Sequence, residues 1–171
     1  MSQEGCLMHN VFVYGTLKSG QPNNIYLNNR TLGKAKFIGK AVCLERRPLV
    51  IYSQYNIPFL LDCPGTGEQV EGEVYQVDDQ MLKWMDDFEE HPTYYLRSKI
   101  QVQMLNNSVH DDSNEIREVW TYILPKYHEK MLELPFIKCY DTYGDHGMPY
   151  VEKSKRPPGA TNEIRLSLLK S

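Results

Sequence analysis

Two different spacings of apolar residues divide most of the chain into predicted strands and one or two short helices. The first of these helices would be opened by Pro22 and run through Ile25 and Leu27. Residues 11–14 (VFVY) are β-branched or aromatic and predict a short, buried first strand. Residues 70–77 alternate between apolar and polar side chains, which is the pattern of a half-buried strand. Further extended segments are expected within residues 37–52, 58–61, 94–105 and 116–124. Gly and Pro mark the turn at 63–67, and residues 106–115 are expected to form a polar loop.

These strands do not alternate regularly with helices, so a doubly wound parallel sheet is not expected. The pattern predicts an α+β fold, with a mixed six- to seven-stranded β-barrel-like sheet and a few short flanking helices. Residues 1–151 are expected to form a single domain. From residue 152 onward, Lys, Arg and Ser together with the PPG cluster at 157–159 predict a loosely ordered C-terminal tail over residues 152–171.

The predicted helix over residues 80–90 carries an acid on its apolar face. Asp78 or Asp79 is expected to cap its start, and Pro92 to end it. Successive residues of an α-helix are rotated by about 100° around its axis. With this rotation, the apolar side chains fall on one face of the predicted helix and most of the charged side chains on the opposite face. Glu89 is the exception, because it follows Leu82 by seven positions and Met85 by four.

A carboxylate that faces a core is costly unless it is paired, protonated or used in chemistry. Burial would raise the pKa of Glu89 toward the range in which a general acid or base works near neutral pH. Two other interpretations stay open. Glu89 could turn to water at a frayed helix end, or it could pair with a buried arginine such as Arg97.

The loop after the first strand is a candidate anion-binding site. A strand that ends in Tyr14, Gly15, Thr16 and Leu17 presents a turn with free backbone N–H groups. Gly15 is expected to adopt a conformation closed to other residues and to let a ligand approach the backbone closely. An ordinary tight turn is the alternative. The spacing of Gly15 and Gly20 resembles a phosphate-binding loop, but Gln-Pro follows where that motif requires Lys and then Ser or Thr, so nucleotide hydrolysis is not expected.

The composition of the chain gives no sign of a nucleic-acid-binding, membrane, secreted or metal-binding protein. The 171 residues carry 19 basic and 22 acidic side chains, and this balance gives no basic face for nucleic acid. No apolar run approaches the length of a membrane span, and residues 1–4 lack the features of a secretory signal. We therefore expect a cytoplasmic protein without nucleic-acid or membrane partners. The four cysteines form no CxxC pair and the five histidines are scattered, so no metal or cofactor is expected.

Several stretches together resemble the γ-glutamylamine cyclotransferases, members of the γ-glutamyl cyclotransferase-like family. The similarity spans roughly residues 10 to 150. The stretches that carry it, with x for any residue, are VFVYGTLKxGQPN at 11–23, NIPFLL at 56–61, VxGEVY at 70–75, ML at 81–82 followed by DDFE at 86–89, YxR at 95–97 and YDxYGxHG at 140–147.

The resemblance implies a six-stranded barrel-like fold and release of 5-oxoproline and a free amine from γ-glutamyl amides such as γ-glutamyl-ε-lysine. It implies that Glu89 is the catalytic carboxylate and that the loop of Tyr14, Gly15, Thr16 and Leu17 holds the substrate. Only a small-molecule partner, and a monomer, are then expected. The sequence differs from close members at residues 148–151 and has a longer tail, which could border the pocket and affect substrate range.

Such a substrate can close its own five-membered ring, so no Ser or Cys nucleophile is needed. Tyr95 and Tyr143 are further candidates for lining the pocket. Three alternatives remain open: a cyclotransferase acting on γ-glutamyl amino acids or glutathione, a non-catalytic metabolite-binding module of the same fold, and a protein-interaction domain that uses its 12 tyrosines.

Overall fold

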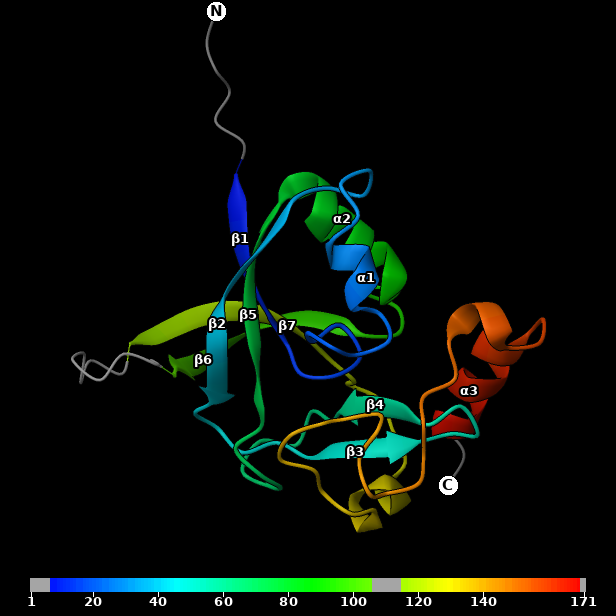
Figure 1. Ribbon diagram of the computed structural model, residues 1–171. Coiled ribbons are helices and arrows are strands. Elements are labelled where there is room, and N and C mark those ends of the chain that lie inside the picture. The colour runs from blue at the N-terminus through cyan, green and yellow to red at the C-terminus, as the bar shows by residue number, and fades with distance from the viewer. Residues whose placement is uncertain (1–6, 106–114, 170–171) are drawn as a thin grey trace, which may run out of the picture.

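Five strands close into a barrel, and two more form a separate hairpin below it (Figure 1). The computed structural model describes residues 7–105 and 115–169, so most of the polar loop expected at 106–115 lies outside the described residues. The five strands of the barrel, in spatial order, are β1 (Met8–Val13), β5 (Glu71–Asp78), β2 (Ala35–Cys43), β6 (Leu96–Met104) and β7 (Ile116–Ile123).

The barrel closes where β1 and β7 run parallel, with Val11 opposite Trp120. The other neighbouring strands are antiparallel. Position 72 in β5 requires a glycine for steric reasons, because an added Cβ would lie 2.4 Å from the backbone oxygen of Val13. The α+β class and the mixed barrel-like sheet predicted from the sequence are therefore confirmed.

The strand count of the barrel differs from the prediction of six to seven. Seven strands exist among the described residues, but β3 (Leu49–Tyr52) and β4 (Ile57–Leu60) pair only with each other. Proline has no N–H to donate to a ladder, so Pro58 suits a strand that has one partner rather than two. The hairpin still contributes to the core, since Leu49, Val50 and Phe59 are fully buried.

Helix α2 (Asp79–Phe88) packs its apolar face onto the barrel, beside the short helix α1 (Asn24–Leu27). Asp78 is the N-cap, and its carboxylate accepts a hydrogen bond of 2.8 Å from the Met81 N–H. The helix ends earlier than the predicted residue 90. Glu89 is its C-cap, and Glu90 has a left-handed φ of 53°.

The C-terminal residues are more ordered than the loose tail expected from the sequence. Lys153–Lys155 forms a 3-10 helix and Ala160–Leu169 forms helix α3. Ala160, Ile164 and Leu168 recur every four residues and are buried in the main core cluster, which explains why the segment folds. A domain boundary at residue 151 stays a prediction.

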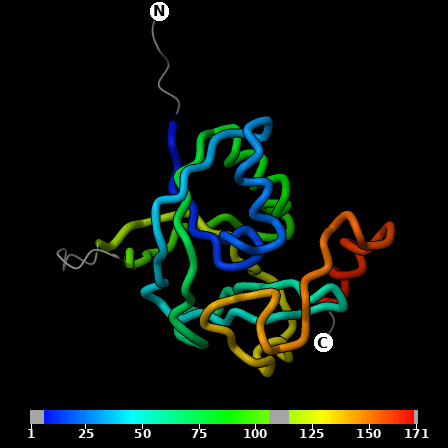
Figure 2. The backbone as a smooth tube through the Cα atoms, viewed as in Figure 1, coloured from blue at the N-terminus to red at the C-terminus, as the bar shows by residue number. Residues whose placement is uncertain are grey.

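The chain before α3 passes beside the β3–β4 hairpin (Figure 2). Val151 donates its N–H to the Tyr55 carbonyl at 3.0 Å, and the Asn56 side chain donates to the Pro149 carbonyl at 2.8 Å. These contacts hold the segment that leads into α3 against the turn between β3 and β4. None of the helices in the described ranges is long and apolar enough to cross a membrane.

Candidate active site

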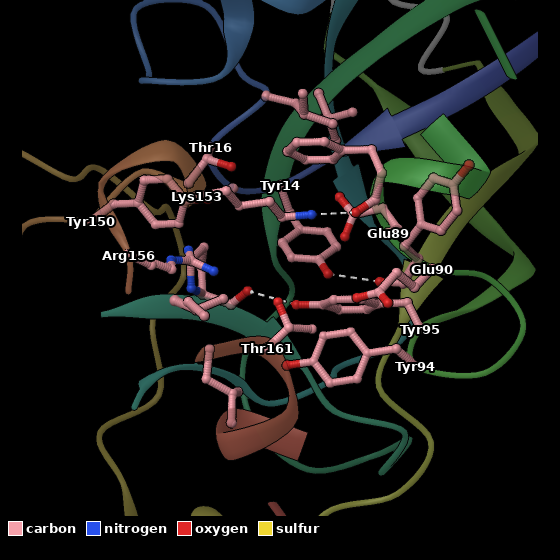
Figure 3. Close-up of a pocket in the computed structure, with 18 of the residues that line it drawn as sticks. Tyr14, Thr16, Glu89, Glu90, Tyr94, Tyr95, Tyr150, Lys153, Arg156 and Thr161 are labelled. Carbon is pink, nitrogen blue, oxygen red and sulfur yellow. Dashed lines mark hydrogen bonds between the residues drawn. The ribbon is translucent and has the colours of Figure 1, made fainter. Parts of the chain in front are cut away.

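A pocket brings together the residues that the sequence predicts for the site (Figure 3). The loop after β1, the C-terminal end of α2, the start of β4 and the C-terminal segment form its walls. The predicted residues that line it are Tyr14, Gly15, Thr16, Leu17 and Glu89. Segments separated by about 75 residues in sequence thus meet at one cavity.

The loop keeps backbone donors free. Among the described residues, none accepts a hydrogen bond from the amide N–H of Gly15, Thr16 or Leu17. Neighbouring groups fix the loop instead. Buried Asn23 donates its side-chain N–H to Thr16 Oγ1 at 2.9 Å, and buried Glu73 accepts the Ser19 N–H at 2.9 Å. A fixed turn with free N–H groups is suited to bind a carboxylate or an oxyanion.

The reason for a glycine at position 15 differs from the one expected. The φ angle of Gly15 lies outside the left-handed region, whereas that of Gly20 is 77°. An added Cβ at Gly15 would lie 3.0 Å from Pro58 Cγ, closer than most such contacts. Close packing against β4 therefore favours a glycine at position 15, and the left-handed conformation occurs at Gly20 instead.

Tyr14 forms a buried wall of the pocket. Its hydroxyl donates to the Tyr122 carbonyl at 2.7 Å. Burial, and then the nearby Glu89, raise the pKa of Tyr14 well above its usual value of 10. The phenol therefore stays neutral at physiological pH, so Tyr14 contributes shape rather than charge.

Glu89 has the electrostatic properties that the sequence predicts for it. The residue is half-buried and lines the pocket. Burial of its carboxyl group raises the pKa from 4.5 to about 7, the Lys153 cation opposes this shift, and Glu90 adds to it. The Lys153 ammonium lies 3.9 Å from the Phe88 ring centre and donates to the Phe88 carbonyl, beside Glu89.

Two other acids of this region do not behave as the helical pattern predicts. Asp86 was expected on the solvent side, but Arg97 Nε donates to it at 2.8 Å and the Tyr122 hydroxyl at 2.7 Å. Arg97 is therefore the partner of Asp86, and the interpretation that pairs it with Glu89 is wrong. Glu90 lines the pocket and pairs with Arg165 of α3. Helical stepping fails for Glu90 because the helix ends before it.

The two tyrosine candidates have different outcomes. Tyr95 is buried and lines the pocket, with its ring stacked on Phe59. Tyr143 is 75% exposed and does not line it. The prediction for Tyr143 is wrong, because its turn projects the side chain to solvent.

The sequence analysis expects that the C-terminal segment could border the pocket, and it does, but the sequence does not identify which of its residues form the wall. The segment is too polar for its four-residue apolar spacing to stand out. The missed residues that line the pocket are Glu90, Tyr94, Tyr150, Lys153, Arg156, Thr161 and Ile164.

The arrangement supports proton transfer next to a bound anion. A carboxyl group with a pKa near 7 can both accept and return a proton at physiological pH. Free amide donors nearby can hold a carboxylate or stabilise a developing oxyanion. No group of three or more His, Cys, Asp or Glu side chains is placed to hold a metal ion within residues 7–105 and 115–169.

The chain is similar to proteins that carry closely related names. The family model described as "Gamma-glutamyl cyclotransferase, AIG2-like" matches residues 11–142. A gamma-glutamylaminecyclotransferase C from Danio rerio is 45% identical over 148 residues, 86% of this chain and 96% of that protein. The gamma-glutamylaminecyclotransferase of Mus musculus is 42% identical over 87% of this chain and 100% of that protein.

The fold comparison agrees. The crystal structure of an AIG2-like protein from Mus musculus superposes with a TM-score of 0.80 at 42% identity, and covers 87% of this chain and 99% of that one. The two proteins therefore share one fold. The residues that the family model matches include both the loop after β1 and Glu89. On these grounds the chain belongs to the gamma-glutamyl cyclotransferase, AIG2-like family.

Proposed function

We propose that the protein is a γ-glutamylamine cyclotransferase, which converts a γ-glutamyl amide into 5-oxoproline and a free amine. The observation that carries the proposal is a carboxyl group with a pKa near 7, Glu89, in one pocket with the free amides of Gly15, Thr16 and Leu17. Relatives 40–45% identical over most of the chain bear the name of this activity.

The reaction needs no nucleophile from the protein. The α-amino nitrogen of the glutamyl group attacks its own γ-carbonyl carbon, the ring C–N bond forms, and the bond to the leaving amine breaks. Because both reacting atoms belong to one molecule, the enzyme mainly has to hold the reactive rotamer. Well-oriented intramolecular reactions gain roughly 7–11 kcal/mol over bimolecular ones.

Glu89 supplies the proton transfers in this proposal. The α-amino group is an ammonium at neutral pH, so the carboxylate first removes a proton to free the nucleophilic lone pair. The carboxylic acid then delivers this proton to the departing amine nitrogen. The ring nitrogen gives up its second proton as the lactam forms, and the amine that takes it up leaves as an ammonium ion. The nearby Lys153 cation favours the ionised carboxylate at the start of the cycle.

The loop supplies the anion contacts. Its three free N–H groups would hold the α-carboxylate of the glutamyl group, the oxyanion that develops on the γ-carbonyl, or both. The link from Asn23 to Thr16 and the link from Glu73 to Ser19 support the loop from two sides, so its donors are arranged before substrate binds.

The biological setting is part of the proposal. We place the enzyme in the cytoplasm as a monomer that acts on small γ-glutamyl amides, such as the γ-glutamyl-ε-lysine left by digestion of transglutaminase cross-links. The free thiols of Cys43, Cys63 and Cys139 are compatible with a reducing compartment.

The test is Glu89→Gln, which keeps the size of the side chain but removes the base. Turnover of γ-glutamyl-ε-lysine to 5-oxoproline should fall about 10²- to 10⁴-fold, since one general acid–base group typically contributes that much. Asp87→Asn is the matched control, because Asp87 lies on the exposed face of the same helix and pairs with Lys83. Near-wild-type turnover by folded Glu89→Gln would reject the role of Glu89. Parallel assays with glutathione would identify the alternative substrate class.

A further inference from the structure

One side of the pocket is supplied by the turn that joins α2 to β6, residues 89–95. In Figure 3 the labelled residues of this turn lie together, on the side of the pocket opposite Tyr150. The residues of the turn that line the pocket are Glu89, Glu90, Tyr94 and Tyr95. The position of the Glu89 carboxyl group therefore depends on what fixes this turn.

An ion pair closes the base of the turn. Asp86 lies in the last turn of α2 and Arg97 is the second residue of β6, so the two residues flank the turn on either side. Arg97 Nε donates to Asp86 Oδ1 at 2.8 Å, and Arg97 Nη2 donates to Asp86 Oδ2 at 3.2 Å. The backbone closes the same base, because the His91 N–H donates to the Asp86 carbonyl at 2.8 Å and the Arg97 N–H donates to His91 Nδ1 at 2.9 Å.

The barrel holds both members of this ion pair. Strands β6 and β7 pair with Arg97 directly opposite Tyr122, and with Lys99 opposite Trp120. Residues two apart in a strand share a face, so these side chains stand together on one face of the sheet. The Tyr122 hydroxyl donates to Asp86 Oδ1 at 2.7 Å, and the Trp120 ring centre lies 4.3 Å from the Arg97 guanidinium carbon. The barrel wall thus binds the Asp86 carboxylate from two strands.

The contact has the properties of an ion pair that fixes a geometry. The side chains of Arg97 and Asp86 are only 18% and 21% exposed, and their contact is bidentate. Charged, bidentate hydrogen bonds of this kind are strong and directional. The neighbouring acid Asp87 pairs with Lys83 instead, and both of those side chains are mostly exposed, where an ion pair contributes little. Two adjacent acids of α2 therefore differ in what they hold.

The helix does not fix Glu89 by itself. Helix α2 ends at Phe88, and Glu90 has a left-handed φ of 53°, a conformation that costs a non-glycine residue free energy and persists where its surroundings enforce it. The residues that line the pocket include Tyr122, but neither Asp86 nor Arg97. The ion pair can therefore reach the reaction through the position of Glu89, and not by contact with the substrate.

We propose that Asp86, bound by Arg97 and Tyr122, is a positioning residue that holds the Glu89 carboxyl group in the pocket, at the reacting nitrogen atoms of the substrate. The inference rests on the proposed function and adds a residue to it. Asp86 takes no part in proton transfer. It keeps the turn closed, so that Glu89 faces the substrate and not water.

The experiment compares Asp86→Asn and Arg97→Met with wild type in two measurements. The first gives kcat and KM for release of 5-oxoproline from γ-glutamyl-ε-lysine. The second follows the ionisation of Glu89 by NMR of isotope-labelled glutamate carboxyl groups, with the signal assigned by its loss in Glu89→Gln. Asp87→Asn is the matched control, because it removes the adjacent, exposed acid of the same helix. Thermal unfolding shows whether each variant is folded.

We expect kcat to fall about 10- to 100-fold in both Asp86→Asn and Arg97→Met, since displacement of a catalytic group by a fraction of its reach costs about this much. KM should change little, because the amides of the loop after β1 still hold the glutamyl group under the proposed function. Asp87→Asn should match wild type in kcat, in KM and in the ionisation of Glu89.

The ionisation of Glu89 separates position from charge, because the two substitutions remove opposite charges. A direct charge effect would lower the pKa of Glu89 in Asp86→Asn and raise it in Arg97→Met. Loss of position exposes the carboxyl group to water, so it should lower the pKa in both variants, from about 7 toward the ordinary value of 4.5. Lys153 and Glu90, whose charges act on Glu89, are present in every variant.

Arg97→Lys is the second variant, for the case that Arg97→Met does not fold. It keeps the positive charge but cannot form the bidentate contact with Asp86. Under the inference it should lower both kcat and the pKa of Glu89, whereas an effect of charge alone would leave both unchanged.

Wild-type kcat together with an unchanged pKa of Glu89 in folded Asp86→Asn would overturn the inference. Shifts of opposite sign in Asp86→Asn and Arg97→Met would overturn it as well. If the wild-type protein releases no 5-oxoproline, the proposed function fails. The NMR measurement then still decides whether Asp86 holds Glu89 in the pocket, so the two failures are distinguishable.

Discussion

At the scale of single residues, Glu89 owes its chemistry to its neighbours. Burial raises its pKa to about 7, Lys153 opposes the shift and Glu90 adds to it. The tyrosines around it, Tyr14, Tyr94 and Tyr95, all have pKa values raised by burial and stay neutral. Glu89 is therefore the group expected to change its charge near neutral pH in this pocket.

This expectation predicts the pH dependence of catalysis. A base must be deprotonated to act, so kcat/KM should rise as pH increases toward about 7 and level off above it. Removal of the cation in Lys153→Met should move this rise to higher pH, because Lys153 lowers the pKa of Glu89. A pH–rate profile of both proteins measures the shift, and superimposable profiles would contradict the coupling.

The same pKa shift predicts that Glu89 lowers stability at neutral pH. The unfolded chain loses the Glu89 proton near pH 4.5, whereas the folded protein keeps it up to about pH 7. The unfolded state therefore binds fewer protons in this window, and the folded state loses stability as pH rises through it. Gln cannot ionise, so Glu89→Gln should gain about 1–3 kcal/mol relative to wild type between pH 4 and pH 8. Urea unfolding at both pH values tests this, and a constant difference would contradict it.

At the scale of elements, α2 delivers Glu89 to the pocket because both of its ends are defined. Its start is set by the Asp78 cap, and its apolar face by buried Met81, Leu82 and Met85. Its end falls at Phe88, so Glu89 and Glu90 diverge in backbone conformation. Rotation or lengthening of the helix would move the carboxylate away from the loop after β1.

The cap is expected to contribute measurably to stability. Asp78→Ala should lower the free energy of unfolding by about 0.5–2 kcal/mol, because it removes the acceptor of the Met81 N–H. Asp78→Asn keeps an acceptor oxygen and is the matched control, so its loss should be smaller. Chemical denaturation of the three proteins provides the comparison, and equal losses in both variants would argue against the cap.

At the scale of the whole molecule, the C-terminal segment and the barrel form one structure. Ala160, Ile164 and Leu168 are buried in the core cluster that also contains Leu82 and Met85 of α2. The Arg165–Glu90 pair joins α3 to the residues just after α2. The pocket is therefore complete only when α3 is docked.

Docking of α3 predicts different effects for two leucines of the same helix. Leu168 is 2% exposed, and Leu168→Ala should cost about 2–4 kcal/mol of unfolding free energy. Leu166 is 59% exposed, and Leu166→Ala should stay within about 0.5 kcal/mol. Thermal or urea unfolding separates the two, and a small effect of Leu168→Ala would mean that α3 is loose, as the sequence suggests.

The sequence by itself determined the local features of the protein. Alternation in residues 70–77, the apolar run at 11–14 and the Asp78 cap predict elements that the structure contains, because the strand and helix periods are properties of neighbouring residues. The position of Glu89 on the apolar face followed from the same period. The barrel class was predictable because the strands do not alternate with helices.

Only the tertiary structure decided which distant groups meet. The pairing of Arg97 with Asp86, the exclusion of β3 and β4 from the barrel, and the wall formed by Arg156 and α3 depend on contacts between segments far apart in sequence. Periodicity says which face of an element is buried, but not what covers it. The raised pKa of Glu89 is therefore a property of the assembled pocket, since burial by distant segments causes it.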